Sequence, residues 1–582
     1  METRMNQWTR ISIAGCLVLA LGCGSDDDPV ADDGTAATGA ETTGGDTDTT
    51  GGGDTTTGDT DGGTTGDGTA DGDDSGTTDG EPTEDQQAIL DVEETKAFAI
   101  PGLKNEVHVL RTEHDIPHIY ATDRLDLGHA VGFLLARDRY FVMDLARRLG
   151  NGNISSLLGD VAIENDVESR LMGMDVITQQ MRDNLDADTE AYLAAVAAGI
   201  NTYIAHVKAG DLPGPSELDL AGPLLGADNP ADLMEEFTVR DLCATGTAVL
   251  FNLNYETDDV GRTAKAASLP TAFEGQDKEE LRKESFLQDM WFNERPIFPG
   301  TNSMPGFGLD TAEPAGKPGA PIPEQSWAPQ NRSTNLTMLN RLATRLQGWQ
   351  DRRKRDRDKG YGSNTWAVNA DKTADGWALV AGDGHLSLSV PALFWRMGFD
   401  TTIMGGGDLH QVGMLITGMY VMSVGTNGHV GFSGVNPVAD ITDWYREEIQ
   451  LDSEGAPAAT MFQGEWKPLS EHEETFEIAD IPALSSVGRT EVHKRWVTFD
   501  GRWLRDIEGR AASSDETLAA GETLVNLGGD WVVPGDEDGD GVVTAVSFDF
   551  TGFDVAQWLK GNDLMGRAKD VTELREAAKY TT

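Results

Sequence analysis

The chain has 582 residues, of which 38% are hydrophobic, so it can bury a large core and is expected to form roughly two to four domains or one large domain with appendages. It carries 98 acidic and 45 basic residues, a formal net charge of −53. A field of this sign opposes binding to nucleic acid and to anionic membrane surfaces, so no nucleic-acid partner is expected.

Residues 1–22 have the features of an export signal. Arg4 and Arg10 precede an apolar run, residues 11–21, that is too short to span a bilayer. The run ends in Leu-Ala-Leu-Gly-Cys23, which resembles a bacterial lipoprotein cleavage box with Cys23 as the lipidated residue. We therefore expect an exported protein, in the bacterial periplasm or on the outer surface, held to a membrane through Cys23. Cleavage of a plain signal peptide near Gly22 is the alternative.

Residues 23–88 are dominated by Gly, Thr, Asp and Ala, and no Lys or Arg occurs between Gly24 and Gln86. Such a segment cannot bury enough apolar area to offset its conformational entropy. We expect a disordered acidic tether between the anchor and the folded body.

Residues 89–298 form the first globular segment. Residues 107–111 alternate as a strand, and residues 126–150 place apolar side chains at three- and four-residue intervals, as a long amphipathic helix does. Further helices are expected over residues 189–209 and 240–253.

Charged side chains and one cysteine complete this segment. Asp138 and the arginines around it are expected to be structural ion-pair partners. Cys243 is the only cysteine beyond the first 23 residues, so no intramolecular disulfide is expected.

Residues 299–362 begin rich in Pro and Gly and end dense in Arg, Lys and Asp. This composition is typical of an excised or flexible spacer. A surface loop followed by a solvated helix would have the same composition.

The spacer ends at Gly362-Ser363-Asn364-Thr365-Trp366, where an apolar strand-like segment begins. If the Gly362–Ser363 bond is cut, the new α-amino group of Ser363, with a reference pKa of about 8, can act as base toward its own hydroxyl. Residues 365–368 and 377–381 predict a hairpin behind this junction. An ordinary turn entering a strand is the alternative.

This junction resembles that of the penicillin acylase family of N-terminal-nucleophile hydrolases, in which Gly-Ser-Asn-x-Trp marks both the self-cleavage site and the catalytic serine. The Ile-Pro-His-Ile stretch ending at Ile119, Ala-Arg-Asp-Arg ending at Arg139 and Leu-Leu-Gly ending at Gly159 resemble the start of the family's α chain. The resemblance covers about residues 91–582. It implies an α+β fold, the four-layer αββα sandwich of two stacked antiparallel sheets, with a mainly helical α-chain segment and an α/β heterodimer cut from one precursor.

The same resemblance suggests the remaining catalytic residues. Residues 382–386 resemble the family segment whose histidine sits beside the nucleophile, which assigns that role to His385; a satisfied core or turn histidine is the alternative. Residues 425–445 resemble the block that supplies an oxyanion-hole donor, here the backbone N–H of Asn436.

A calcium site is implied by the end of that block. Its ligands would be Asp440, the carbonyl of Thr442 and Asp443, completed by Glu256 or Asp258; a solvated acidic turn is the alternative. No organic cofactor is expected.

A second acidic stretch, residues 536–541, spaces carboxylates like the first half of an EF-hand loop. Ser547 stands where the closing Glu would be, so an acidic hairpin turn competes with a second calcium site.

Together these features predict an exported amidohydrolase that cleaves N-acylated small molecules of the β-lactam, acyl-homoserine lactone or lipopeptide type through Ser363. An inactive surface-anchored homologue or binding protein is the alternative, and the lack of His-rich ligand spacing disfavours a metalloenzyme. Family members extend beyond the equivalent of Thr582. Residues 363–582 are therefore expected to be the N-terminal part of a longer β chain, without the region that supplies a side-chain oxyanion Asn and a neighbouring Arg.

Overall fold

The computed structural model describes residues 81–254, 259–261, 263–264, 335–358, 362–386, 392–435, 442–527, 530–539, 541–553 and 557–581. The chain divides into a small unit, Ser25–Asp91, and a main unit that contains Val92–Thr582. The described part of the small unit holds helix α2 (Glu84–Leu90), which Thr83 caps. The predicted signal lies outside the described residues, as does most of the tether. Among the described residues, no helix is both long and apolar enough to cross a bilayer.

The helices of the main unit are α3 (Arg124–Asn151), α4 (Ser155–Leu158), α5 (Ile163–Leu171), α6 (Met174–Asp183), α7 (Ala187–Ala209), α8 (Ser216–Ala221), α9 (Val239–Asn254), α12 (Leu336–Asp358), α13 (Trp558–Arg567) and α14 (Val571–Ala578). Short 3-10 turns are η2 (Glu113–Asp115), η3 (Gly159–Val161), η4 (Pro230–Leu233), η7 (Ala370–Lys372), η8 (Pro482–Leu484) and η9 (Thr551–Phe553). The three long helices predicted upstream of the spacer are confirmed as α3, α7 and α9. Their ends follow local chemistry, since Asp123 caps α3 and Asp186 caps α7 by accepting backbone N–H groups.

A six-stranded sheet combines strands from both sides of the predicted cleavage site. Its order is β1 (His108–Arg111), β2 (Pro117–Tyr120), β5 (Phe394–Asp400), β6 (His410–Ile416), β7 (Val424–Thr426) and β8 (Gly431–Ser433). The β2–β5 pair is parallel, with His118 opposite Gly398, and the other pairs are antiparallel. The expectation of purely antiparallel sheets is therefore wrong at this one pair.

The second large sheet is antiparallel throughout and has seven strands. Its order is β11 (Glu465–Pro468), β10 (Pro457–Phe462), β9 (Thr442–Leu451), β18 (Val543–Phe550), β14 (Trp503–Ile507), β13 (Arg489–Val497) and β12 (Ser470–Ile478). A three-stranded sheet consists of β15 (Gly509–Ala512), β17 (Trp531–Pro534) and β16 (Val525–Asn526). A two-stranded sheet consists of β3 (Gly362–Val368) and β4 (Leu379–His385).

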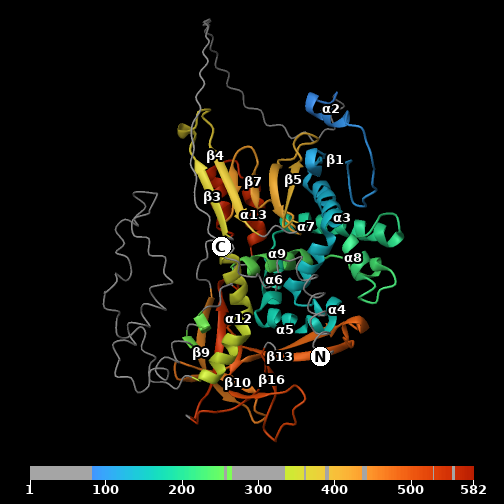
Figure 1. The fold of residues 1–582 in the computed structure, drawn as a ribbon. Helices are drawn as coiled ribbons and strands as arrows, with labels where there is room; N and C mark the ends of the chain where they lie inside the picture. The colour runs from blue at the N-terminus through green and yellow to red at the C-terminus, as the bar shows by residue number, and fades with distance from the viewer. Residues whose placement is uncertain are drawn as a thin grey trace, which may run out of the picture. The chain divides into compact units, whose positions relative to one another are not determined.

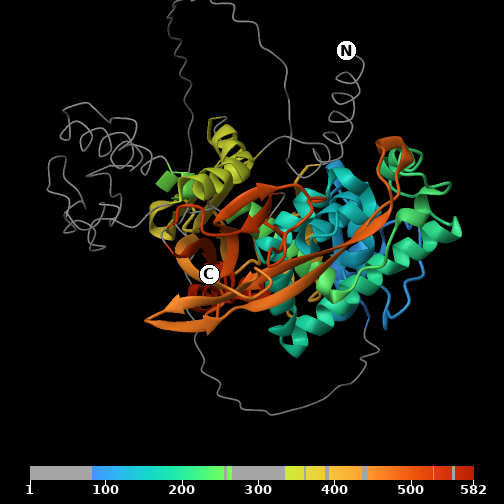
Figure 2. The same ribbon diagram turned by 90° about the horizontal axis from the view of Figure 1, so that it is seen from below.

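The six-stranded sheet separates a helical layer from the β3–β4 hairpin. Trp395, Met397 and Phe399 alternate along β5 and join the main core with residues of α3, α7 and α9. Phe394 and Arg396, which alternate with these residues, point to the opposite side of the strand, and Phe394 lies beside Gly384 of the hairpin. The helices and both large sheets can be followed in Figure 1, and Figure 2 shows the helices beside the strands of the seven-stranded sheet. The predicted α+β class is confirmed.

The predicted spacer, residues 299–362, contains α12. Met338, Leu339, Leu342 and Leu346 of this helix are buried in a cluster with Val260, Ala264 and Val546 of β18. The described part of the predicted spacer therefore includes a packed helix as well as the junction itself.

Candidate active site

Ser363 is the second residue of β3, at the start of the β3–β4 hairpin, as the sequence predicted. The hairpin can be seen in Figure 1. The two strands pair along their whole length, with Gly362 opposite His385 and Ser363 opposite Gly384. Both strands are longer than the sequence indicated, so the predicted cleavage site and His385 belong to the same paired segment.

The Ser363 hydroxyl points at the peptide bond that is predicted to be cut. Its Oγ donates a hydrogen bond to the Gly362 carbonyl oxygen at 2.7 Å. A nucleophile for this peptide bond is thus already beside it in the uncut chain. The hydrogen bond also polarises the carbonyl that would be attacked.

His385 takes part in a polar cluster that the sequence did not reveal. Its Nε2 lies 3.1 Å from Asp383 Oδ2 and 3.2 Å from Asn364 Nδ2. Depending on its tautomer, Nε2 donates to the carboxylate or accepts from the amide. Two signals could have identified these partners: Asp383 and His385 are two residues apart on one strand, and Asn364 is the cross-strand partner of Asp383.

Gly382 and Gly384 both allow β4 to pack closely on the six-stranded sheet. A Cβ at Gly382 would lie 2.1 Å from Ser433 Oγ, and a Cβ at Gly384 would lie 3.2 Å from Phe394 Cε2. Ser433 and Phe394 belong to different strands of that sheet. Since β4 touches both, it crosses the face of the sheet, and these close contacts hold it there.

Most of the other predicted site residues lie outside the described residues: Cys23, Glu256, Asp258, Asn436 and Asp440. Of the predicted calcium ligands, only Thr442 and Asp443 are described. They are adjacent at the start of β9, where Thr442 is buried and Asp443 is exposed opposite Asp549 of β18. The oxyanion donor and the calcium site therefore remain predictions.

The second acidic stretch, residues 536–541, lies beside Glu508, a carboxylate that the spacing of the sequence did not predict there. Carboxylate oxygens of Glu508, Asp536 and Asp538 lie within 4.8 Å of one another. Glu508 is fully buried and accepts the N–H groups of Glu537, Asp538 and Thr544. Ser547 lies inside β18 and donates to Glu447, so it does not close the loop. Backbone donors thus hold the turn together.

The structural ion pairs expected in the first globular segment are confirmed. Asp138 pairs with Arg111, and Asp144 pairs with both Arg147 and Arg148. Cys243 is buried and free, and burial raises the pKa of its thiol to about 12, so it is not a candidate nucleophile.

Comparison with known proteins places these observations in a family. The chain is 26% identical over 390 residues to penicillin acylase 2 proenzyme of Pseudomonas sp. strain SE83, covering 64% of this chain and 41% of that protein. It is 24% identical over 381 residues to the acyl-homoserine lactone acylase QuiP of Pseudomonas aeruginosa, covering 65% of this chain and 38% of that protein. It is also 24% identical over 437 residues to penicillin G acylase of Escherichia coli, covering 70% and 47%.

The chain spans 38–47% of the length of these three relatives. Among solved structures, a thermostable penicillin G acylase from Alcaligenes faecalis matches 33% of this chain and 94% of its own chain, with a TM-score of 0.27 and 24% identity. The sequence model of the family described as penicillin amidase matches residues 106–582. The chain therefore belongs to the penicillin amidase family.

Proposed function

We propose that the chain is the precursor of an exported N-acyl amide hydrolase that cuts itself between Gly362 and Ser363. The observation that carries this proposal is the Ser363 hydroxyl, which donates to the Gly362 carbonyl oxygen at 2.7 Å in a hairpin that also holds His385. Family membership supports the same reaction class.

The cut proceeds in two steps. Ser363 Oγ bonds to the Gly362 carbonyl carbon, the bond from that carbon to the Ser363 nitrogen breaks, and the hydroxyl proton passes to the departing nitrogen. Water then hydrolyses the resulting ester. The products are a Gly362 carboxylate and a Ser363 with a free α-amine.

Hydrolysis of substrate reuses the same atoms. The α-amine takes the proton as Ser363 Oγ attacks the substrate amide, then delivers it to the leaving amine, and water removes the acyl group from the serine. His385, fixed by Asp383, is proposed to orient the hydroxyl or the substrate. The backbone N–H of Asn436 is proposed to bind the oxyanion.

The fragments on the two sides of the cut are proposed to remain together as a heterodimer. Strand β2 lies upstream of the cut and β5 downstream, and their pairing builds one sheet from both fragments. The main core likewise includes residues from both sides. Separation would expose this core to water, which is unfavourable.

The substrate class follows from the relatives, which are named as penicillin and acyl-homoserine lactone acylases. We propose a small N-acylated amide, of the β-lactam, acyl-homoserine lactone or lipopeptide type.

Calcium bound by Asp440, Thr442 and Asp443, with Glu256 or Asp258, is proposed as a structural ion. Loss of stabilisation by added calcium in an Asp443→Asn variant would support this, and unchanged stabilisation would reject it.

Membrane attachment through Cys23 is a separate proposal, which rests on the lipoprotein-like box. Cys23→Ala is expected to release the protein from the membrane fraction of a bacterial host. An unchanged distribution between fractions would exclude the anchor.

The hydrolase proposal is tested by assaying the full chain against a panel of N-acyl substrates. Ser363→Ala is expected to reduce amine release to background. Thr365→Val, which removes the next hydroxyl on the same face of β3, is the matched control and is expected to stay within about twofold. A fully active Ser363→Ala variant would contradict the proposal, and a chain that binds these compounds without hydrolysing them would instead favour a binding protein.

A further inference from the structure

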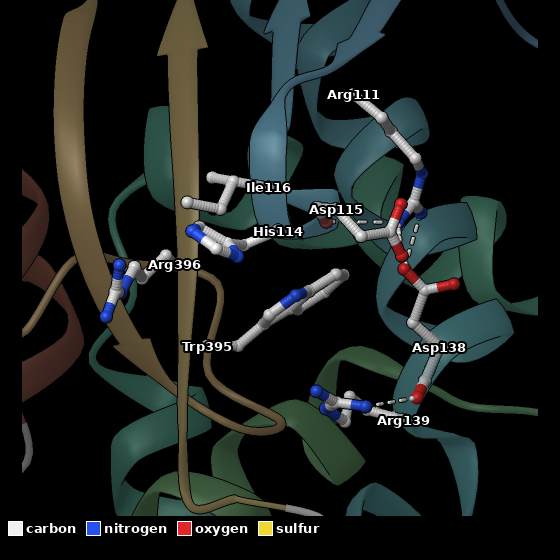
Figure 3. Close-up of a pocket in the computed structure, with 8 residues that line it drawn as sticks. All are labelled: Arg111, His114, Asp115, Ile116, Asp138, Arg139, Trp395 and Arg396. Atoms are coloured by element: carbon white, nitrogen blue, oxygen red, sulfur yellow. Dashed lines mark hydrogen bonds and ion pairs between the residues drawn. The ribbon is translucent and has the colours of Figure 1, made fainter.

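A cavity of about 630 Å³ lies where β5 runs past the end of β2 (Figure 3). The parallel pairing of these strands begins at His118 and Gly398, so among the described residues the preceding part of β5 has no partner on β2. The volume is within the range of small-molecule sites. Ser363 does not line the cavity, so a ligand bound here would be separate from the proposed hydrolysis.

One end of the cavity is acidic. Asp115 and Asp138 share a single arginine of the lining, Arg111, which lies 3.0 Å from the first carboxylate and 2.5 Å from the second. These two carboxylates and one guanidinium leave one negative charge. Arg137, which does not line the cavity, approaches only Asp138, at 3.8 Å. The side chain of Asp115 is 76% exposed and, among the described residues, it pairs with Arg111 alone through one oxygen, so its other oxygen is open to a ligand.

The other end of the cavity is basic. Arg139 lines it, and within the described part of the chain no carboxylate forms an ion pair with this arginine. Its guanidinium lies over the Trp395 ring, 5.6 Å from the ring centroid, and donates to the Asp138 carbonyl oxygen at 3.1 Å. Arg396, the next residue of β5, points to the opposite side of the strand. The charges that line the Trp395 side of the strand therefore sum to zero, but they are separated into an acidic end and a basic end.

An apolar surface lies between the two ends. Figure 3 shows the Trp395 ring with Arg139 below it and the carboxylates of the acidic end to one side. Ile116 also lines the cavity. Asp115 has a left-handed backbone, with φ of 60°. Such a conformation persists where the surrounding structure holds it, and such residues cluster at ligand sites.

We propose that this cavity binds a small zwitterion that carries a flat apolar ring, such as an aromatic amino acid. The ammonium group binds at Asp115, the carboxylate binds at Arg139, and the ring packs against Trp395 and Ile116. A guanidinium suits a carboxylate because its planar donors match the two oxygens. A ligand with only one of the two charges would leave one end of the cavity unpaired. The inference does not depend on hydrolysis at Ser363.

The test titrates three ligands calorimetrically into the full chain: phenylalanine, 3-phenylpropionate, which lacks the ammonium group, and phenethylamine, which lacks the carboxylate. None of them contains an amide bond that the chain could hydrolyse. Phenylalanine is expected to bind at least about tenfold more tightly than either analogue, because each analogue loses one hydrogen bond between charged groups. An analogue that binds as tightly as phenylalanine, or no binding of phenylalanine at millimolar concentration, would overturn the proposal.

Two variants test the two ends separately. Asp115→Asn introduces a residue that also tolerates the left-handed backbone; it should weaken phenylalanine binding about tenfold without weakening the binding of 3-phenylpropionate. Arg139→Gln should weaken phenylalanine binding about tenfold without weakening the binding of phenethylamine. Since the Asp115 side chain is exposed, its variant decides the matter if Arg139→Gln does not fold.

Glu113→Gln is the matched control, because it removes an exposed carboxylate from the same turn, η2, that does not line the cavity. Its affinity for phenylalanine is expected to equal that of the parent chain. Unchanged binding of phenylalanine in Asp115→Asn, or an equal loss in Glu113→Gln and Asp115→Asn, would contradict the assignment of the acidic end and overturn the proposal.

Discussion

The two segments that flank the Gly362–Ser363 junction differ sharply in how they are held. Upstream, α12 buries four apolar side chains, and Arg341 reaches the fully buried Asp506 at 2.6 Å. Downstream, nearly every residue of the β3–β4 hairpin is exposed, and β4 is held by close contacts at Gly382 and Gly384. The bond that is predicted to be cut therefore lies between a firmly packed helix, α12, and a hairpin with few stabilising contacts.

This difference indicates which side of the junction can move. Loss of α12 would remove both ion pairs that Asp506 makes with this helix, the close one with Arg341 and the longer one with Arg345 at 3.9 Å. An uncompensated buried charge is costly, so the described, packed turns of α12 are expected to stay bound after the cut. The hairpin can adjust its position at a much smaller cost in free energy.

The largest effect is expected for Arg341→Met, made in the uncut Ser363→Ala chain. It removes the main partner of a buried carboxylate and should lower the free energy of unfolding by about 3 kcal/mol. Urea titration followed by circular dichroism measures this. Asn340→Ala, at an exposed position of the same helix, is the control and should change the value by less than about 0.5 kcal/mol. Equal values for both variants would mean that α12 is not anchored through Asp506.

A smaller effect is expected for Gly382→Ala. The added methyl group would meet Ser433 and force the side chain or the strand to shift, at a cost of about 1–3 kcal/mol. Because the hairpin carries Ser363, the cut should also slow, as followed on denaturing gels over time. Gly376→Ala changes a hairpin glycine with open space around it; its positive φ of 72° costs stability too, but leaves the packing of β4 unchanged. A slowed cut in Gly376→Ala alone would contradict the role given to the close contacts.

The smallest effect is expected for Trp377→Ala, at the turn of the hairpin. Trp377 is 76% exposed, so its removal should change the free energy of unfolding by less than about 0.5 kcal/mol. The same urea titration measures it. A loss above about 2 kcal/mol would show that the hairpin is held as firmly as α12.

Local patterns predicted the parts of the fold that depend on neighbouring residues. Apolar spacing located α3, α7 and α9, and the Gly-Ser junction with its alternating strands located the hairpin. Composition suggested a spacer where α12 packs. The many charged residues at the end of that helix outweighed, in the composition of the segment, the apolar residues Met338, Leu342 and Leu346, which are buried.

Contacts between distant segments could not be read from the sequence. The β2–β5 pairing joins residues 280 positions apart in sequence, His118 and Gly398, and no local pattern specifies it. Glu508 lies beside Asp536 and Asp538 because β15, which follows it, pairs with β17, which precedes them, with Gly509 opposite Pro534. The stack of Arg139 on Trp395 likewise depends on α3 lying against β5.

The central claim is the cut between Gly362 and Ser363, and the mass of the purified full chain tests it most directly. Two fragments are predicted, one of which begins at Ser363, while Ser363→Ala should give one uncut chain and Thr365→Val should be cut like the parent. N-terminal sequencing of the downstream fragment identifies the bond. A folded parent chain that remains intact across Gly362–Ser363, or a fragment that begins at another residue, would contradict the account.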